Sequence, residues 1–151
     1  MANQVETKLI PSLFESLQKE RYAILSTVDY ETGGPNVSAL SWVLAPDKNR
    51  VYISIDNRSR IVENINNNPL VVLNVIANES TYSISGKAHI KVKKMDGVPL
   101  KLALVEIAIN EVRDVMFYGS KISNEPNYEK TYDEVAADKL DKQVMDAMRL
   151  T

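Results

Sequence analysis

The chain has 151 residues and a formal net charge of −2; 44% of its residues are hydrophobic and 25% are charged. These values are typical of one globular domain, and the near balance of charge excludes a broad basic surface for nucleic acid. The sequence contains no cysteine, which excludes disulfides, thiol nucleophiles and cysteine metal sites. The first residues lack the pattern of a signal peptide, and no run is long enough for a transmembrane helix. We therefore expect a cytoplasmic protein with no membrane partner.

The first part of the chain predicts one helix followed by strands. Apolar residues recur at helical spacing over residues 8–19, which predicts an amphipathic helix. Residues 22–28 and 36–45 are rich in strand-forming residues, and a turn with two glycines and a proline separates them. Residues 51–56 alternate between apolar and polar side chains, so they predict a third strand that is half-buried.

A short helix is predicted directly after this third strand. Ser59 is a good N-cap, apolar side chains recur on one face over the next two turns, and Pro69 follows the helix. The N–H groups and positive dipole end of a helix N-terminus favour an anion. Arg58 and Arg60 flank the cap with charged donors suited to phosphate oxygens. This segment therefore predicts a phosphate-binding site between two strands.

Three further strands are expected in the middle of the chain. Residues 70–77 predict the fourth strand, which a hairpin turn at residues 78–80 joins to the fifth. The fifth strand alternates between apolar and polar residues up to Val92, which is typical of an antiparallel sheet with one wet face. The sixth strand starts near Ala103 and is expected to continue through Val115 and Phe117.

The end of the chain predicts a loop and a helix. Residues 119–130 are polar and are expected to form a loop, and residues 133–149 predict an amphipathic helix. Its expected apolar stripe includes Val135, whereas Asp141 is assigned to the solvated face with the other acidic residues of this helix. Trp42 is expected in the core, with stacking on a cofactor or a partner subunit as the alternative.

These elements predict one mainly β domain. Six strands joined by short turns, with helices outside, predict a small antiparallel β-barrel with flanking helices, closed or split, over residues 22–118. A β-sandwich is the alternative.

Eight short motifs follow one another in the first two-thirds of the chain. In order, they read AILSTVD from residue 23, GP from 34, VSALSW from 37, VYIS from 51, SR from 59, NI from 64, NP from 68 and SGKA from 85. As a set, they resemble the pyridoxamine 5′-phosphate oxidase-like, FMN-binding split-barrel superfamily. The resemblance is closest to its small general-stress-protein and flavin-reductase-like members, and it implies a six-stranded antiparallel split barrel.

The resemblance also implies where the cofactor binds. It implies a homodimer that holds two FMN molecules in clefts between the subunits. By the family pattern, Ser54, Ser59 and Arg60 hold the flavin phosphate, which agrees with the local chemistry described above. The second strand lies along the isoalloxazine ring, which the following residues would contact through their backbone groups: Ser38, Ala39, Leu40 and Ser41.

Departures from the family pattern bear on the substrate. The family commonly has a lysine where this chain has Ile61, and Arg58 is the candidate substitute. The authentic oxidase has an arginine at the position of Ser38 and a lysine at that of Val43. Its carboxyl-terminal arginine and histidine pattern is also missing, and only Arg149 lies near the end of this chain. We therefore expect no oxidation of pyridoxamine phosphate.

The residues do not suggest a catalytic acid, base, nucleophile or metal site. The single histidine, His89, lies on the polar face of a strand beside lysines. This suits a flavoprotein, in which the cofactor carries the redox chemistry. The expected function is an FMN-dependent oxidoreductase or flavin reductase that passes electrons from a nicotinamide to a small-molecule acceptor. The alternatives are a non-catalytic flavin-binding stress protein and a haem- or deazaflavin-binding relative.

The homodimer is expected to form through apolar strand surface that one barrel cannot bury. The residues assigned to this surface are Trp42, Val43, Leu73, Val75, Ile107 and Ile109.

Overall fold

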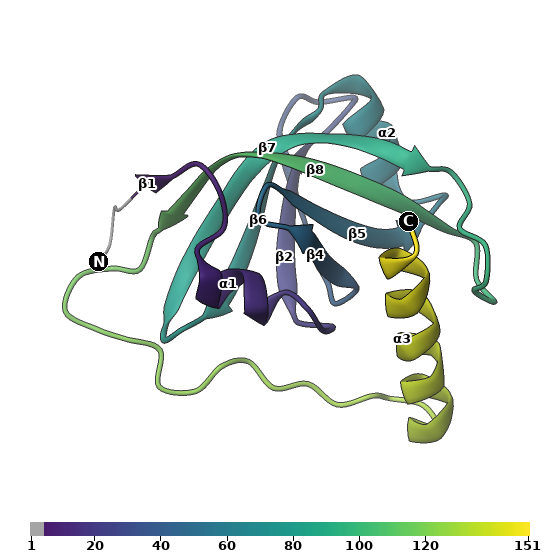
Figure 1. Cartoon of the computed structure of the whole chain (residues 1–151). Helices are drawn as coiled ribbons and strands as arrows, with labels where there is room; N and C mark the ends of the chain where they lie inside the picture. Colours follow the sequence, from purple (N-terminus) through teal and green to yellow (C-terminus); the bar gives the residue numbers. More distant parts are fainter. Residues whose placement is uncertain (1–4) are drawn as a thin grey trace.

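The computed structural model describes residues 5–151, which form eight strands and three helices (Figure 1). The elements are β1 (Val5–Glu6), α1 (Pro11–Ser16), β2 (Ala23–Val28), β3 (Pro35–Leu40), β4 (Val43–Asp47), β5 (Arg50–Asp56), α2 (Arg60–Asn67), β6 (Leu70–Ala77), β7 (Ser80–Val92), β8 (Leu102–Asp114) and α3 (Glu134–Arg149). Among these residues, no helix is both long and apolar enough to cross a bilayer.

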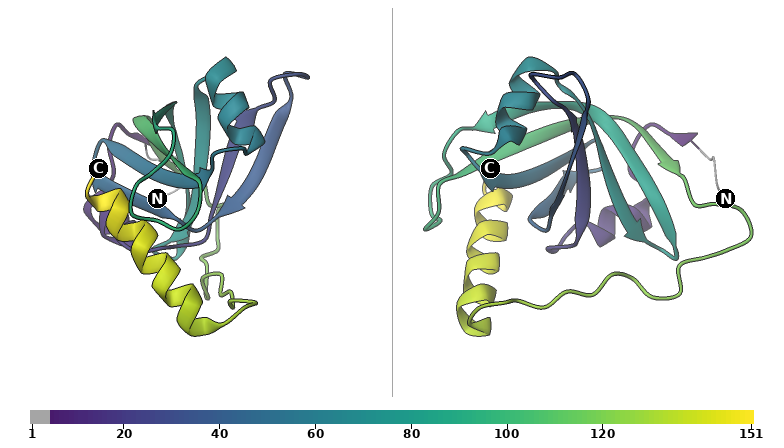
Figure 2. Two further views of the ribbon diagram at one scale, coloured as in Figure 1. Left: turned by 90° about the vertical axis from the view of Figure 1, so that its right-hand side faces the viewer. Right: turned by 180° about the vertical axis from the view of Figure 1, so that it is seen from behind.

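All strands belong to one antiparallel sheet that curls around the core without closing (Figure 2). Its order is β3-β2-β6-β7-β8-β5-β4, and β1 pairs with β8 at one end. The two edge strands, β3 and β4, are neighbours in the sequence and are joined by Ser41 and Trp42. The chain therefore crosses the opening of the barrel at this link. This arrangement confirms the predicted antiparallel split barrel with flanking helices.

The structure has two more strands than expected, and one of them arises because the predicted strand over residues 36–45 is interrupted. The Ser41 carbonyl accepts hydrogen bonds from the N–H groups of Arg21 and Val43, at 2.9 and 3.0 Å, and the Trp42 carbonyl accepts one from Ser54 at 3.1 Å. The backbone thus stops pairing with β2 and starts pairing with β5 within two residues. The short β1 is the other addition.

The interior of the barrel holds the main hydrophobic core. Helix α1 lies at the lower end in Figure 1 and inserts Leu13 into this core, while α2 lies at the upper end. Four residues expected at a subunit interface are instead fully buried here: Val43, Leu73, Val75 and Ile107. That expectation was wrong because their side chains point to the concave face of the curled sheet. Trp42 and Ile109 are partly buried.

A second core lies between α3 and the outer face of β4 and β5. Leu44, Tyr52 and Leu104 pack there with Val144 and Met148. The expected placement of two other α3 residues was wrong. Val135 is 76% exposed because it lies in the first turn, before α3 meets the sheet, and Asp141 is buried on the docked face.

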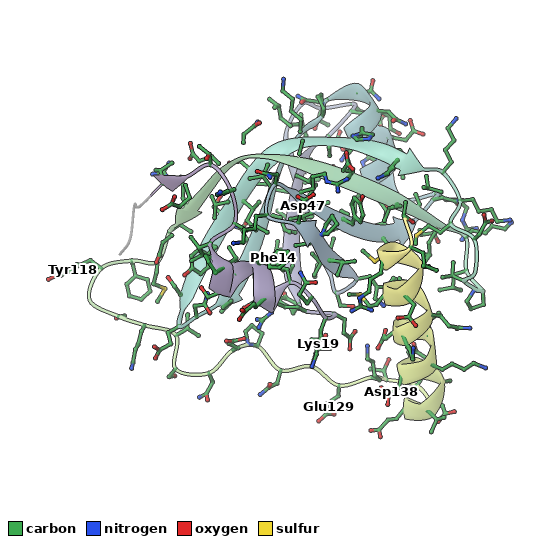
Figure 3. All side chains as sticks on the ribbon, viewed as in Figure 1. Phe14, Lys19, Asp47, Tyr118, Glu129 and Asp138 are labelled. Atoms are coloured by element: carbon green, nitrogen blue, oxygen red, sulfur yellow. The ribbon has the colours of Figure 1, made fainter. Side chains whose placement is uncertain are left out.

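Strand β8 ends before the predicted continuation. Val115 and Phe117 are exposed and lie in the long connection over residues 115–133, which runs below the barrel to α3 (Figure 1). Tyr118 projects from this connection away from the protein (Figure 3). The connection has few apolar residues to pack on the sheet, so polar and charged contacts hold it instead. Among them are ion pairs of Lys121 with Glu79 and of Arg21 with Glu125.

Two short segments explain how β6, β7 and β8 pair. Asn78 and Glu79 both have positive φ, 52° and 61°, as a two-residue type I′ hairpin requires, so the predicted turn is confirmed. Gly86 follows a register shift against β8. A Cβ at this position would overlap the Ala108 carbonyl oxygen and come within 3.0 Å of Ile107 Cγ2, so only glycine allows this close approach.

Candidate functional site

A cavity of about 400 Å³ lies at the opening of the barrel, between β3 and β5. Its lining residues are Ser38, Ala39, Leu40, Ser41, Trp42, Ser54, Ile55, Asp56, Ser59 and Ile61. They come from β3, the link to β4, the end of β5 and the start of α2. The fold therefore brings six of the eight predicted cofactor residues to one cavity.

Strand β3 contributes backbone groups as well as side chains to this cavity. It pairs with β2 along its whole length, and no strand among the described residues pairs with its other side. An edge strand presents alternate N–H and C=O groups outward. Residues 38–41 can therefore offer both donors and acceptors to a flat polar ring.

Ser54 is the buried hydroxyl of the site. It is 3% exposed, and its Oγ donates to the Met95 sulfur at 3.2 Å. A thioether sulfur is a weak acceptor. A phosphate oxygen in the cavity would be a much stronger acceptor for the same hydroxyl.

Ser59 is confirmed as the N-cap of α2. Its Oγ accepts the backbone N–H of Ile61 at 3.1 Å, and its backbone is extended, as an N-cap requires. The helix N-terminus, with its positive dipole end, therefore borders the cavity.

Hydrogen bonds of Asn64 hold α2 with its N-terminus beside the cavity. Its side chain is buried and donates to Thr27 Oγ1 at 2.9 Å and to Asn36 Oδ1 at 2.8 Å. Its own Oδ1 accepts the backbone N–H of Tyr30 at 2.9 Å. This asparagine ties the helix to β2, β3 and the turn between them, so it fixes where Ser59 points.

The two arginines lie beside the cavity and are paired with carboxylates. Arg58 is highly exposed and pairs with Asp56 at 3.1 Å. Arg60 donates to the buried Asp29 at 2.7 Å and to Glu31 at 2.9 Å. Neither arginine lines the cavity. Phosphate contact would require Arg60 to turn from these partners or to share its donors with them.

Asp29 was not identified from the sequence. Besides Arg60, it accepts the backbone N–H groups of Glu31 and Thr32 at 3.0 and 2.8 Å. The Arg60 guanidinium and these N–H groups hold the pKa of Asp29 well below its usual range. Asp29 begins the run Asp-Tyr-Glu-Thr-Gly-Gly, in which the aspartate and the two glycines signal a turn and so predict the local hydrogen bonds. Its ion pair with Arg60 spans 31 positions and depends on the fold.

Trp42 borders the cavity and is anchored from the opposite side. Its indole N–H donates to Asp141 Oδ1 of α3 at 2.8 Å. Lys130 Nζ lies 2.7 Å from the other oxygen of the same carboxylate. These partners are about 90 to 100 positions away in sequence, so sequence periodicity did not identify them.

A second cavity, of about 460 Å³, lies between α1 and the connection at residues 125–128. Its charged residues bond mainly to protein groups, for example Arg21 to Glu125 at 2.7 Å and to the Ile76 carbonyl at 2.8 Å. It contains none of the predicted cofactor residues. The cavity at the barrel opening is therefore the candidate functional site.

Comparison with known proteins agrees with this fold. A sequence model of the pyridoxamine 5′-phosphate oxidase family matches residues 9–116, well over half of the chain. The chain therefore belongs to this family, as its motifs predicted. Members of the family typically bind flavin-type cofactors. No curated protein matches the chain.

Several solved structures share the fold. A candidate pyridoxamine 5′-phosphate oxidase from Lactobacillus delbrueckii gives a TM-score of 0.62 at 18% identity, over 74% of this chain and 98% of the other. General stress protein 26 from Bacillus anthracis gives 0.53 at 19% identity, over 66% and 91%. An F420 reductase gives 0.56 at 21% identity, over 68% and 98%. At these identities the similarity concerns the fold.

Proposed function

We propose that the cavity binds FMN and that the protein is an FMN-dependent oxidoreductase of the flavin-reductase type. The main observation in support of FMN binding is that the cavity brings together the backbone of residues 38–41, the hydroxyl of Ser54 and the N-capped start of α2. These groups match the two ends of FMN: a flat ring with polar edges and a phosphate. When bound, FMN supplies a ring that accepts and passes on two electrons.

The phosphate end fits the part of the cavity lined by Ser54 and the start of α2. Ser54 Oγ has only a thioether acceptor, and Ser59 places the N-terminus of α2 beside it. Arg58 and Arg60 flank the N-cap, and either guanidinium would reach the phosphate by turning from its carboxylate partner or by sharing its donors with it. A hydroxyl donor, a helix N-terminus and a guanidinium are the groups that proteins use for phosphate.

The chemistry of the lining leaves electron transfer to the cofactor. Among the described residues of the cavity, the only one with a charged side chain is Asp56. Its hydrogen bonds with Arg58 lower its pKa, so it stays ionised and paired. We propose that the protein positions FMN beside a nicotinamide donor and then a flat, uncharged acceptor.

We further propose a homodimer, which is common in this family. The outer face of β2, β3 and β6 offers an apolar surface in place of the one expected from the sequence. Val37 is 65% exposed and Leu70 is 53% exposed, and Val28 and Val72 line a shallow cavity on the same sheet. Surfaces of this kind mark protein contacts. Since β3 also borders the candidate site, a partner on its outer face would lie beside the open cavity.

The visible spectrum of freshly purified protein tests the cofactor. We expect the bands of oxidised flavin, restored by added FMN if the flavin is lost during purification. A Soret band would point to haem and contradict the proposal. Anaerobic addition of NADH or NADPH then tests the reaction: bleaching supports a reductase, whereas bound FMN that stays oxidised indicates a flavin-binding protein without this activity.

A further inference from the structure

The chain continues beyond the part that matches the family. The family model ends at residue 116, and the last 35 positions are called here the C-terminal extension, residues 117–151. Helix α3 of this extension stands against the outer side of β4 and β5 (Figure 1). Strand β4 begins at Val43, directly after Trp42 of the candidate site. The extension thus packs behind one wall of the cavity.

Besides its apolar packing on β4 and β5, the extension makes a polar, mostly buried contact with this wall. Trp42 Nε1 donates to Asp141 Oδ1 at 2.8 Å. Lys130 Nζ lies 2.7 Å from Asp141 Oδ2 and 3.1 Å from Glu20 Oε2. The side chains of Lys130 and Asp141 are only 21% and 11% exposed. The Lys130 ammonium group therefore joins the connection before α3, α3 itself and the segment between α1 and β2.

This geometry determines how the indole can lie. A buried indole N–H needs an acceptor, and a carboxylate is a stronger acceptor than a neutral oxygen. The acceptor lies on α3, so the pyrrole edge of Trp42 is held toward α3 while the residue still lines the cavity. Lys130 in turn limits the motion of the Asp141 carboxylate, since swinging it away would separate a buried ion pair.

We propose that the C-terminal extension is a clamp that fixes Trp42 as an aromatic wall of the site. Asp141 is the positioning residue, and the held indole selects ligands with a flat, uncharged ring. The identity of the ligand rests on the proposed FMN function, whereas the clamp itself rests on the contacts of Asp141. Without the clamp, Trp42 would sample other orientations and the cavity would lose a defined wall.

The clamp is testable without any ligand because Trp42 is the only tryptophan of the chain. In D141A, we expect the emission of Trp42 to shift to longer wavelength and its quenching by acrylamide to increase. The matched control is D138A, which removes an exposed aspartate from the same helix (Figure 3) and should leave both unchanged. D141N keeps an oxygen acceptor, so it should fall between D141A and the wild type. A folded D141A with wild-type emission and quenching would overturn the clamp.

A measurement on the unchanged protein keeps the test independent of folding. The single indole N–H resonance in an NMR spectrum should exchange slowly with water, because its proton is held by a buried carboxylate. Rapid exchange, at the rate of a free indole, would overturn the proposal even if D141A does not fold.

The effect on the site is measured with FMN as the probe. By calorimetry, D141A should weaken FMN binding about 2- to 10-fold, the range that an aromatic contact supplies, and D138A should not change it. Equal affinity in D141A and the wild type would overturn the role of the clamp in the site. If the wild type binds no FMN, the proposed function fails, while the fluorescence and exchange results still decide the clamp.

Discussion

Replacement of Ser54 by alanine separates binding from folding at the candidate site. In the protein without ligand, the hydroxyl donates only to the Met95 thioether, at 3.2 Å. S54A removes one weak hydrogen bond and leaves the buried backbone intact, so the free energy of unfolding should change by about 0.5 kcal/mol or less. With FMN bound, the same hydroxyl should donate to a charged phosphate oxygen. Loss of a hydrogen bond to a charged group should weaken binding by about 1.5–3 kcal/mol, roughly 10- to 150-fold in Kd.

The assay is a calorimetric FMN titration combined with urea unfolding of the protein without FMN. S83A is the matched control, because Ser83 is a half-buried serine of β7 that lines neither the candidate site nor the shallow cavity of the proposed dimer surface. It should leave the FMN affinity unchanged. A wild-type Kd in folded S54A would refute the assignment of Ser54 to the phosphate. A Kd that rises together with a large loss of stability would show that Ser54 acts on the fold instead.

Four other predictions follow from the structure. R60A should weaken FMN binding about 10-fold or more. The same variant tests the ion pair with Asp29: because Arg60 lowers the pKa of Asp29, the pair stabilises the fold above the ordinary pKa of an aspartate. This contribution to the free energy of unfolding is lost as pH falls. The stability difference between the wild type and R60A in urea should therefore shrink as pH falls from about 5 to 2, and a constant difference would contradict the pairing. G86A should lower the free energy of unfolding by about 1–3 kcal/mol, whereas G34A, with no contact closer than 3.4 Å, should change it little. Light scattering should give the mass of two chains for the wild type and of one chain for V37D; a wild-type monomer at micromolar concentration would contradict the dimer. FMN-loaded protein should not form pyridoxal 5′-phosphate, because Ser38, Val43 and Ile61 stand where the family pattern has cations. Turnover of about 1 per second or more would contradict this expectation.

The stability of α3 does not arise from a continuous apolar stripe, which is why its sequence pattern was only partly informative. Asp133 caps the helix through its bond to the Val135 N–H at 3.3 Å, near the predicted start. Val144 and Met148 are buried as expected. Val135 lies too far from the sheet to be covered. Asp141 is buried because Trp42 donates a hydrogen bond to one of its oxygens and Lys130 forms an ion pair with the other. A buried carboxylate looks like a solvated one in sequence, because its partners lie on other elements.

The same limit applies to the arginines of the site. The sequence predicted two cations beside a capped helix, and the structure confirms both the cap and their position next to it. The pairing of Arg60 with Asp29 and Glu31 depends on how the turn after β2 approaches α2. Local spacing carries no information on such approaches.

The sequence by itself determined the antiparallel strands, the hairpin at Asn78, the N-cap at Ser59 and the family, because each depends on short-range patterns. Alternation sets the faces of a strand, and turn and cap residues act within a few positions. Only the tertiary structure decided where the barrel opens, which apolar faces are internal and how α3 reaches Trp42. These features depend on contacts between segments tens of residues apart, which are set when the curled sheet encloses its core. The candidate site lies at the opening because the chain changes strand partners there, at Ser41 and Trp42.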